Sequence, residues 1–496
     1  MTNFDQLVRI AQRGLPFTST DGRPFFRISI PSSGGFQIVL LRSLAFRNWF
    51  FANYFGDYNS LPTNAGFRAI LHHLEAQANF SPGNQRLAVR QRVGSRGRDP
   101  LPSQILLDLA DEEGQFVEIS PDGWVVTAGE NALLETRRAT LELPVPTHHP
   151  DGPAAALDTL RSCLNLSSRT GWLRCLAWLL SAFRPFGPCS FLVIQGPPGS
   201  GKTFTARLLR YLVDPATAPL SPLPHSARQL LAMARHHWLL TFDHVSTLTP
   251  PFNDAFCRLA TGAGALAPEV APADPARDTL FQFVRRPAVF AVTSQWSPAP
   301  DFARRALTIT LADLPPDRLR SETEIFDQFT PAYPAVLGAL CSALSTALRR
   351  RPEIQLTGDL RHPDTLAWAL AAAPALGYTE SEMQEALTGT AAPPPLFQFL
   401  DSLLAETGHW SGTATALFRL LPPDPKFGNP RALKQALNAA AAPLAAAGIA
   451  IESGAKHNPK LIHLRRVANP GNLPGFASPN PAPTPQSAEN KTSKSA

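Results

Sequence analysis

One stretch of eight residues carries a pattern that proteins use to hold the phosphates of a nucleotide. The pattern G-x-x-x-x-G-K-[ST] is formed by Gly196, Pro197, Pro198, Gly199, Ser200, Gly201, Lys202 and Thr203. Its glycines let backbone N–H groups surround phosphate oxygens, and the start of the following helix adds a favourable dipole. Lys202 is predicted to reach the β- and γ-phosphates of ATP, and Thr203 is predicted to ligate Mg²⁺.

A carboxylate at the end of a second strand completes the predicted metal site. Residues 191–195 form an apolar run before the phosphate loop, and residues 202–213 have the apolar spacing of an amphipathic helix after it. A second apolar run, 238–243, ends in Asp243, where a carboxylate can hold Mg²⁺ through water. ATP and Mg²⁺ are therefore the expected cofactors, with Lys202 and Asp243 as catalytic residues.

Hydrolysis of ATP also needs a group that polarises the attacking water. The residue after Asp243 is His244, where many ATPases carry Glu or Asp. Hydrolysis is therefore expected to be slow, or to use a base from elsewhere in the chain. Asp254 and Asp278 are two possible sources of that base.

A third apolar run, residues 288–293, predicts a strand that lies between the first two. Its polar end, Thr-Ser-Gln at 293–295, either orients the water near the γ-phosphate or simply terminates the strand.

Four arginines after this strand could act on the γ-phosphate. Arg304 and Arg305 can reach the nucleotide of a neighbouring subunit and neutralise transition-state charge as an arginine finger. The alternative is a solvated basic start of a helix. Arg318 and Arg320, at the entry to the next helical region, could be a second sensor, although a structural role is the stronger interpretation.

The composition of the chain excludes several classes of protein. Its 496 residues are 44% hydrophobic and 17% charged, which predicts about three domains and excludes a wholly disordered protein. No uninterrupted apolar stretch of ~18 residues and no secretory signal is visible, so no membrane association is expected. The net charge of +6 permits DNA as a partner without requiring it. Five cysteines without a C-x-x-C pair favour reduced thiols in the cytoplasm and no zinc site.

The first 150 residues predict an α+β domain. Apolar residues alternate in some of its segments and recur at helical spacing in others. The expected strands are 25–31, 36–41, 87–93, 104–109, 116–119 and 124–127, and the expected helices are 42–55 and 63–80. Residues 143–153, which are rich in proline, are expected to form a linker.

The rest of the chain predicts an α/β domain and smaller parts. Residues 151–350 alternate apolar strands with helices, beginning with one long helix at 154–183. Residues 351–393 predict a helical connector, and residues 468–496 predict a disordered tail. The expected fold class is therefore α/β: a P-loop ATPase core with an α+β N-terminal domain and a winged-helix-like module at 394–467.

The order helix–helix–helix–hairpin at 394–467 is typical of a winged helix. Trp410 is expected in its core and Thr413 as a helix cap. The candidate DNA-binding residues on the expected recognition helix and wing are Arg431, Lys434, Lys456 and Lys460, with further charge from Arg465 and Arg466. A module that binds another protein is the alternative.

Two histidine pairs and one basic run give weaker indications of function. The pairs His72-His73 and His236-His237 lack ligand partners at metal-binding spacing, so we interpret both as structural. The basic run at 90–98 is either a hairpin facing DNA or, more simply, a solvated turn.

The order of these motifs resembles that of AAA+ and superfamily 3 helicases. More closely, the chain resembles ATP-binding proteins of phages and integrative elements that occur near primases or inside primase–helicase proteins. The closer resemblance is carried by residues 234–246 (ARHHWLLTFDHVS), 254–262 (DAFCRLATG) and 301–305 (DFARR). A weaker likeness extends into residues 36–150.

The resemblance implies an ATPase that forms a homo-oligomeric ring and acts on DNA as a helicase, translocase or loader in mobile-element or phage-type replication. A primase or another replication protein is a possible partner. Two features depart from the family: His244 replaces the usual Asn, and residues 265–277 are rich in Ala and Pro where relatives carry basic and aromatic residues. An ATP-binding switch or scaffold with little turnover is therefore one alternative. A small-molecule P-loop kinase is another, although the arginine pair and the C-terminal module argue against it.

Overall fold

A computed structural model describes residues 3–19, 22–30, 35–80, 92–96, 103–128, 140–267, 280–315, 319–356, 362–389, 399–400, 402–404, 408–420, 429–439, 444, 449–453 and 461–466. Contacts within the chain divide it into two compact units, Met1–Gly389 and Thr390–Ala496. This boundary lies close to the one expected before residue 394. The parts expected at 1–150, 151–350 and 351–393 all fall within the first unit.

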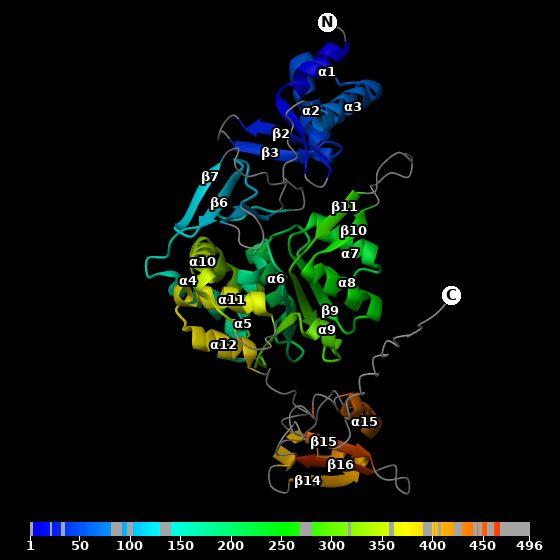
Figure 1. Ribbon diagram of the computed structural model, residues 1–496, viewed down its shortest axis with the longest axis vertical. Helices are drawn as coiled ribbons and strands as arrows, with labels where there is room; N and C mark the ends of the chain where they lie inside the picture. Colours follow the sequence, from blue (N-terminus) through cyan, green and yellow to red (C-terminus); the bar gives the residue numbers. More distant parts are fainter. Residues whose placement is uncertain are drawn as a thin grey trace, which may run out of the picture. The chain divides into compact units, whose positions relative to one another are not determined.

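The first unit contains a four-stranded parallel sheet with the strand order β13-β8-β12-β9. Figure 1 labels β9 of this sheet. Its strands are β8 (Phe191–Gln195), β9 (Leu240–Val245), β12 (Ala288–Val292) and β13 (Ala306–Thr310). Strand β12 pairs in parallel with both β8 and β9. The third apolar run therefore lies between the first two, as expected from the sequence.

Helices cover both faces of this sheet because successive side chains of a strand point to opposite faces. Phe191 and Val193 pack in one core with helix α8, and Leu192 and Ile194 pack in another with helix α6. Figure 1 shows α6 and α8 on either side of β9. The helices are α6 (Lys202–Val213), α7 (Ala227–His236), α8 (Pro250–Thr261) and the short α9 (Pro300–Ala303). An antiparallel hairpin, β10 (Ala263–Ala267) with β11 (Leu280–Val284), follows α8.

The single helix expected at 154–183 is wrong: the structure has two, α4 (Pro153–Ser162) and α5 (Arg169–Ala182). In the break, the side chain of Asn165 donates hydrogen bonds to the carbonyl oxygens of Ser200 at 3.2 Å and Ala312 at 2.8 Å. Ser168 then caps α5 by accepting the N–H of Gly171 at 3.0 Å. The break places an amide against the back of the phosphate loop.

Three helices follow the parallel sheet: α10 (Glu322–Arg350), α11 (Pro363–Ala372) and α12 (Glu380–Thr388). Two short 3₁₀ turns, η2 (Arg351–Glu353) and η3 (Ala373–Leu376), connect them. By length and composition α10 could cross a membrane, but 67% of its most apolar window is buried inside the protein. It is packed as a core helix.

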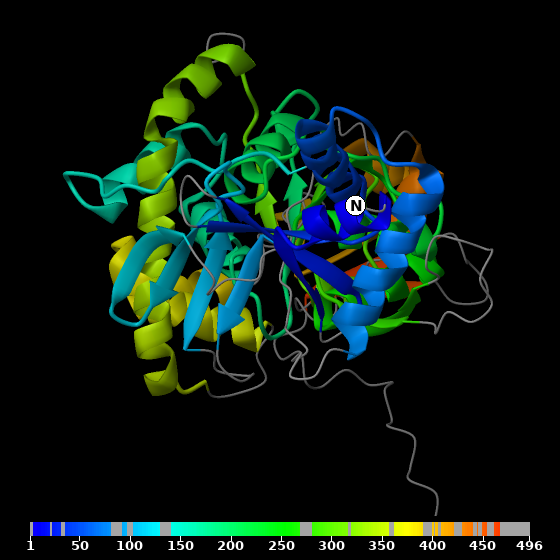
Figure 2. The ribbon, with the colours of Figure 1, turned by 90° about the horizontal axis from the view of Figure 1, so that it is seen from above.

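A four-stranded antiparallel sheet lies beside α10 (Figure 2). Its strands are β4 (Val93–Arg96), β5 (Gln104–Asp108), β6 (Gln115–Ser120) and β7 (Gly123–Ala128). Trp124 Nε1 on β7 donates a hydrogen bond of 3.0 Å to Ser342 Oγ on α10. This sheet therefore shares its core with the parallel sheet's helices rather than forming a separate domain.

The segment 143–153, expected to be a linker, is held in place at its start and near its middle. The N–H of Leu143 donates to the carbonyl of Leu109 at 2.8 Å, and that of Thr147 donates to the carbonyl of Pro334 at 3.0 Å. A Cβ at Gly338 would lie only 2.0 Å from the carbonyl oxygen of Thr147, so the helix needs glycine there. The prolines of this segment fit an extended strap against α10.

The N-terminal residues form a three-stranded antiparallel sheet with three helices. The strands are β1 (Gly14–Thr18), β2 (Pro24–Ile30) and β3 (Gly35–Leu40), and the helices are α1 (Asn3–Ala11), α2 (Leu44–Tyr58) and α3 (Asn64–Phe80). The expected elements here are confirmed within a few residues, and α1 and β1 are additions. Most of the strand expected at 87–93 lies outside the described residues.

The second unit has a sheet of order β14-β16-β15 around a small core. Its elements are β14 (His409–Thr413), α14 (Ala414–Leu420), α15 (Pro430–Ala439), β15 (Ile449–Ser453) and β16 (Leu461–Arg466), and the described residues between 399 and 404 are helical. Thr413 caps α14, as expected, by accepting the N–H of Ala416 at 3.2 Å. Strand β14, which carries Trp410, was not expected. The tail 468–496 lies outside the described residues.

Candidate functional site

The phosphate loop joins the carboxyl end of β8 to the amino end of α6. Two of its glycines have left-handed backbones, Gly199 with φ 78° and Gly201 with φ 88°, and L-residues with side chains rarely adopt these angles. A Cβ on Gly196 would lie 2.7 Å from Ser200 Oγ. The glycine spacing in the sequence is thus required by the path of the loop.

Lys202 folds back over this loop. Its Nζ donates hydrogen bonds to the carbonyl oxygens of Gly196 at 2.9 Å and Pro197 at 2.8 Å. Partial burial lowers the pKa of the Lys202 ammonium, and the charge of Asp243 opposes this shift. The ammonium group is therefore held over the hollow of the loop, where it could exchange carbonyl oxygens for phosphate oxygens.

Thr203 and Asp243 meet at the carboxyl edge of the parallel sheet. Thr203 Oγ1 donates a hydrogen bond of 3.2 Å to Asp243 Oδ1, although the two residues are 40 positions apart. A hydroxyl and a carboxylate are hard oxygen donors of the kind that Mg²⁺ prefers. The two predicted metal ligands are therefore brought together and fit the ion.

His244 bends the strand immediately after Asp243. It has φ 58°, and the pairing of β9 with β12 shifts register next to it. Its backbone N–H donates to Asp243 Oδ1 at 2.9 Å, so the bend helps to orient the carboxylate. Asn tolerates this left-handed conformation better than most residues do, because its short polar side chain can bond locally.

The predicted nucleotide residues line one cleft with a volume of about 810 Å³. Its wall contains most of the phosphate loop, the end of β9 and the end of β12, and the residues outside the loop include Asp243, His244, Ser246, Thr293, Ser294, Gln295 and Glu322. The backbone N–H of Thr293 donates to the carbonyl of Val245 at 2.9 Å, which joins the two strand ends. The three motifs found in the sequence therefore lie together along this wall.

The acidic side chains on the described wall of the cleft are already engaged. Asp243 bonds Thr203, and Glu322 pairs with Arg207. Asp254 does not line the cleft: it lies on α8 and pairs with Arg258 at 3.0 Å. Asp278, the other candidate base, lies outside the described residues.

Arg304 and Arg305 lie at the opposite end of the sheet. The carbonyl of Arg305 accepts the N–H of Phe191, the first residue of β8, at 2.8 Å. The phosphate loop follows the last residue of this five-residue strand, about 16 Å farther along at ~3.3 Å per residue. These arginines therefore lie at the amino edge of the sheet, and the cleft lies at its carboxyl edge.

The two arginines differ in their contacts. Arg305 Nη1 donates to the carbonyl of Asp301 at 2.7 Å. Arg304 is exposed, and among the described residues its side chain makes no hydrogen bond or ion pair. Arg320 bonds Gln328 Oε1 at 2.8 Å and the carbonyl of Ser162 at 2.7 Å, away from the cleft wall. Its sensor interpretation is therefore replaced by a structural one, and Arg318 lies outside the described residues.

The basic run at 90–98 is not simply a solvated turn. Arg92 is 3% exposed, and its Nε lies 3.1 Å from Asp214 Oδ1 at the end of α6. Asp214 Oδ2 accepts the N–H groups of Trp238 at 2.9 Å and Leu239 at 3.1 Å, at the start of β9. Burial alone would raise the pKa of Asp214, but Arg210 and Arg92 outweigh it and the pKa is lowered. No local pattern marked Asp214 as important.

The second unit exposes some of the predicted basic residues. Leu433 and Leu437 bury one face of α15, while Arg431 is exposed and Lys434 is half-buried. Arg465 and Arg466 are exposed at the end of β16, and Lys456 and Lys460 lie outside the described residues. Among the residues that the structure describes, no group of three or more His, Cys, Asp and Glu could hold a metal, and all five cysteines are free.

Comparison with known proteins relates the central part of the chain to a replication family. Residues 157–382 match the family model described as actinomycete integrative conjugative element replication protein. This match supports the expected association with replication of mobile elements. No curated protein matches the chain.

Two of the solved structures that are similar to this chain come from one protein. One is the apo structure of the NrS-1 C-terminal region, at 10% identity over 93% of this chain and 98% of that chain, with a TM-score of 0.34. The other is its A form, at 9% identity over 81% of this chain and 78% of that chain, with a TM-score of 0.36.

Proposed function

We propose that this protein is an ATP-binding, Mg²⁺-dependent ATPase of the AAA+/superfamily 3 type that acts on DNA during replication of a mobile element. The observation that carries the proposal is the single cleft in which the phosphate loop, Asp243 and the polar end of β12 meet. In it, Lys202 would contact the β- and γ-phosphates, and Thr203 and Asp243 would hold Mg²⁺, which neutralises charge on the phosphates when bound. The backbone N–H groups of the loop would surround the phosphates.

The active form of the protein would be a ring of identical subunits in the cytoplasm. Arg304 is exposed at the amino edge of the sheet and too far from its own cleft to complete it, which supports a role on a neighbour's nucleotide. Exposed Arg431, Arg465 and Arg466 support DNA contacts from a winged-helix-like C-terminal unit. Such a ring could unwind DNA, translocate along DNA, or load a partner such as a primase.

The substitution Lys202→Ala tests the nucleotide site. The variant keeps the backbone of the loop but removes the positive charge of the Lys202 side chain. Calorimetry should therefore show ATP affinity lowered by about tenfold or more, which corresponds to ~1.4 kcal/mol of binding free energy. Arg68→Ala, which removes a positive charge at an exposed site on α3 outside the cleft wall, is the control and should bind ATP like the unaltered protein. Equal ATP affinity of the Lys202 variant and the control would contradict the proposal.

An ATP-binding switch with little turnover is the second candidate, because the acidic residues on the described cleft wall are engaged elsewhere. ATPase rates measured with and without single-stranded DNA separate the two. Turnover that DNA stimulates favours the motor, and tight binding with negligible turnover under both conditions favours the switch.

A further inference from the structure

The nucleotide cleft contains one acid that the sequence motifs did not mark. Glu322 lies on the wall of this cleft, together with the phosphate loop, Asp243 and the polar end of β12. It is the first residue of α10 and lies 115 positions after Arg207, its ion-pair partner on α6. Among the residues described on this wall, the carboxylates are those of Asp243 and Glu322. Because the proposed function has Asp243 hold Mg²⁺, Glu322 is the acid that remains for the attacking water.

The start of α10 does not use the Glu322 carboxylate as a cap. Ser321 Oγ accepts the N–H of Glu324 at 3.1 Å, and Glu324 Oε2 accepts the N–H of Ser321 at 2.7 Å. This reciprocal capping box satisfies two backbone donors of the helix N-terminus. The Glu322 side chain is therefore not needed to begin the helix.

Packing between α10 and α6 places Glu322 beside the first turn of α6. Phe326, one turn after Glu322, packs edge-to-face against Phe204, with 5.5 Å between the ring centroids. Phe204 directly follows Thr203, the predicted metal ligand. Arg207 comes one turn after Thr203, and helical side chains lean back toward the start of their helix. The ion pair therefore lies beside the turn that carries Thr203.

The two oxygens of the Glu322 carboxylate have different surroundings. Oε2 accepts a hydrogen bond from Arg207 Nη1, and Oε1 accepts none from the residues that the structure describes. The side chain of Glu322 is 53% exposed and that of Arg207 is 34% exposed. An ion pair this open to water favours the paired state by a factor of about five at most. One oxygen is thus oriented by the arginine, while the other is able to take a proton.

We propose that Glu322 is the general base for ATP hydrolysis in the cleft of its own subunit, and that Arg207 is a positioning residue for its carboxylate. The inference rests on the proposed ATPase function. Glu322 Oε1 accepts a proton from the attacking water, whose oxygen bonds to the γ-phosphorus. The bond from phosphorus to the β–γ bridging oxygen breaks, and ADP leaves with that electron pair. The proton then passes from Glu322 to solvent.

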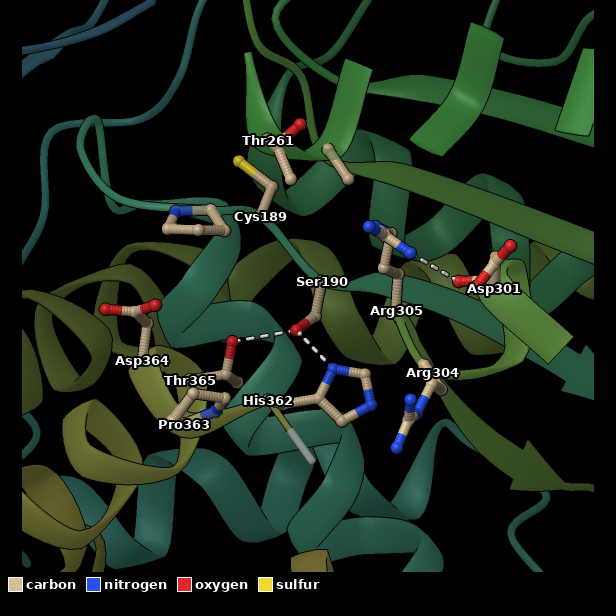
Figure 3. Close-up of a pocket in the computed structure, with 12 residues that line it drawn as sticks. Cys189, Ser190, Thr261, Asp301, Arg304, Arg305, His362, Pro363, Asp364 and Thr365 are labelled. Carbon is tan, nitrogen blue, oxygen red and sulfur yellow. Dashed lines mark hydrogen bonds between the residues drawn. The ribbon is translucent and has the colours of Figure 1, made fainter. Parts of the chain in front are cut away.

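Glu322 differs from the arginine pair in the subunit on which it would act. Arg304 and Arg305 line a second pocket, of about 580 Å³, as Figure 3 shows. His362 lines the same pocket, where its Nδ1 lies 3.1 Å from Ser190 Oγ. No described residue lines both this pocket and the nucleotide cleft. The base would therefore act within one subunit, whereas the arginines would act on the neighbouring one.

The substitution Glu322→Gln in the full chain tests the base with little change of shape. ATP turnover should fall by ~10²-fold or more, because a general base contributes about that factor, and ATP affinity measured by calorimetry should be unchanged. Glu380→Gln is the matched control. Glu380 is also the first residue of a helix with a capping box, α12, and it pairs with Arg350, but it is not on the cleft wall. This control should hydrolyse ATP like the unaltered protein.

The substitution Arg207→Ala tests the positioning role. Without the ion pair the carboxylate can turn away from the water, so kcat should fall about two- to fivefold while KM stays unchanged. Arg207→Lys keeps the positive charge and should recover part of the lost kcat. A higher KM with normal kcat would show that Arg207 binds the nucleotide, and it would contradict the positioning role.

Mixing experiments test whether Glu322 acts within its own subunit. Glu322→Gln mixed with Lys202→Ala should restore no turnover, because neither subunit then has a complete cleft. Arg304→Ala/Arg305→Ala mixed with Lys202→Ala is the positive control and should restore turnover. In a separate measurement, Glu322→Ala leaves space beside the water, and added formate, a small carboxylate, should raise its turnover.

Three results would each overturn the proposal: normal turnover of Glu322→Gln, an equal loss in Glu380→Gln, or turnover restored by mixing Glu322→Gln with Lys202→Ala. If the unaltered protein binds ATP through Lys202 but hydrolyses none, the ATPase function fails first, and this inference fails with it. If Lys202→Ala abolishes turnover while Glu322→Gln hydrolyses ATP normally, only this inference fails.

Discussion

Arg92 and Asp214, 122 positions apart, form a buried ion pair of 3.1 Å whose side chains are 1% and 2% exposed. Arg92 directly precedes β4 of the antiparallel sheet, and Asp214 directly follows α6, the helix that begins at the phosphate loop. Arg210 also lies on Asp214, at 3.2 Å. The carboxylate of Asp214 thus joins three parts of the unit: the end of α6, the start of β9 and the N-terminal part.

Asp214→Asn should lower the free energy of unfolding by about 3–5 kcal/mol, because it leaves two buried guanidinium groups without their counter-charge. Urea unfolding measures this. Asp254→Asn removes the partner of Arg258 on the surface and is the control, with an expected change of at most about 1 kcal/mol. Similar losses in both variants would show that the buried pair contributes little.

The carboxylate of Asp214 should also make the stability of the folded protein sensitive to acid. The pKa of Asp214 is lower in the folded protein than in the unfolded chain, where it is about 3.9. Its contribution to stability is therefore complete above that value and is lost as the pH falls through the folded pKa. Below about pH 4, the free energy of unfolding should therefore decrease less steeply with falling pH for Asp214→Asn than for the unaltered protein, and unfolding curves at several pH values measure this.

His244 should tolerate some substitutions and not others. His244→Val should lower the free energy of unfolding by about 1–3 kcal/mol, because a β-branched residue resists φ 58°. His244→Asn should leave it unchanged or raise it slightly, since Asn accepts this conformation. Thermal unfolding of the two variants checks the order, and a more stable Val variant would contradict the backbone argument.

Arg304 and Arg305 should act only between subunits. Arg304→Ala/Arg305→Ala should keep ATP affinity near that of the unaltered protein and lose ~10³-fold or more of turnover, since arginine fingers contribute about that much. Mixing it with Lys202→Ala should restore activity in ATPase assays. Turnover that stays normal would remove the finger assignment, and a dead variant that mixing does not restore would contradict the assignment between subunits.

Removal of the second unit tests its DNA contacts. A chain ending at Gly389, the observed boundary, should bind ATP normally but bind DNA more weakly, with a shallower dependence of affinity on salt. Fewer phosphate contacts release fewer counterions, which is the reason for the change in slope. Binding titrations at several salt concentrations measure it. Equal slopes for both chains would indicate that the unit binds another protein.

The phosphate loop, its flanking strand and helix, and Asp243 at a strand end could be predicted from the sequence because each depends on neighbours within a few residues. Apolar runs determine buried strands, and glycine at 199 and 201 is required by the local backbone angles. The position of the third strand between the first two was also predicted from the motifs, and the structure agrees with it.

The buried state of Arg92, the break at Asn165 and the place of His362 were decided only by tertiary structure. Arg92 looks like any residue of a basic run until packing brings Asp214 beside it. His362 and Ser190 are 172 positions apart, and their contact arises because α11 packs on α5 beside the start of β8. Burial and charge pairing depend on groups that are distant in sequence, so no local pattern records them.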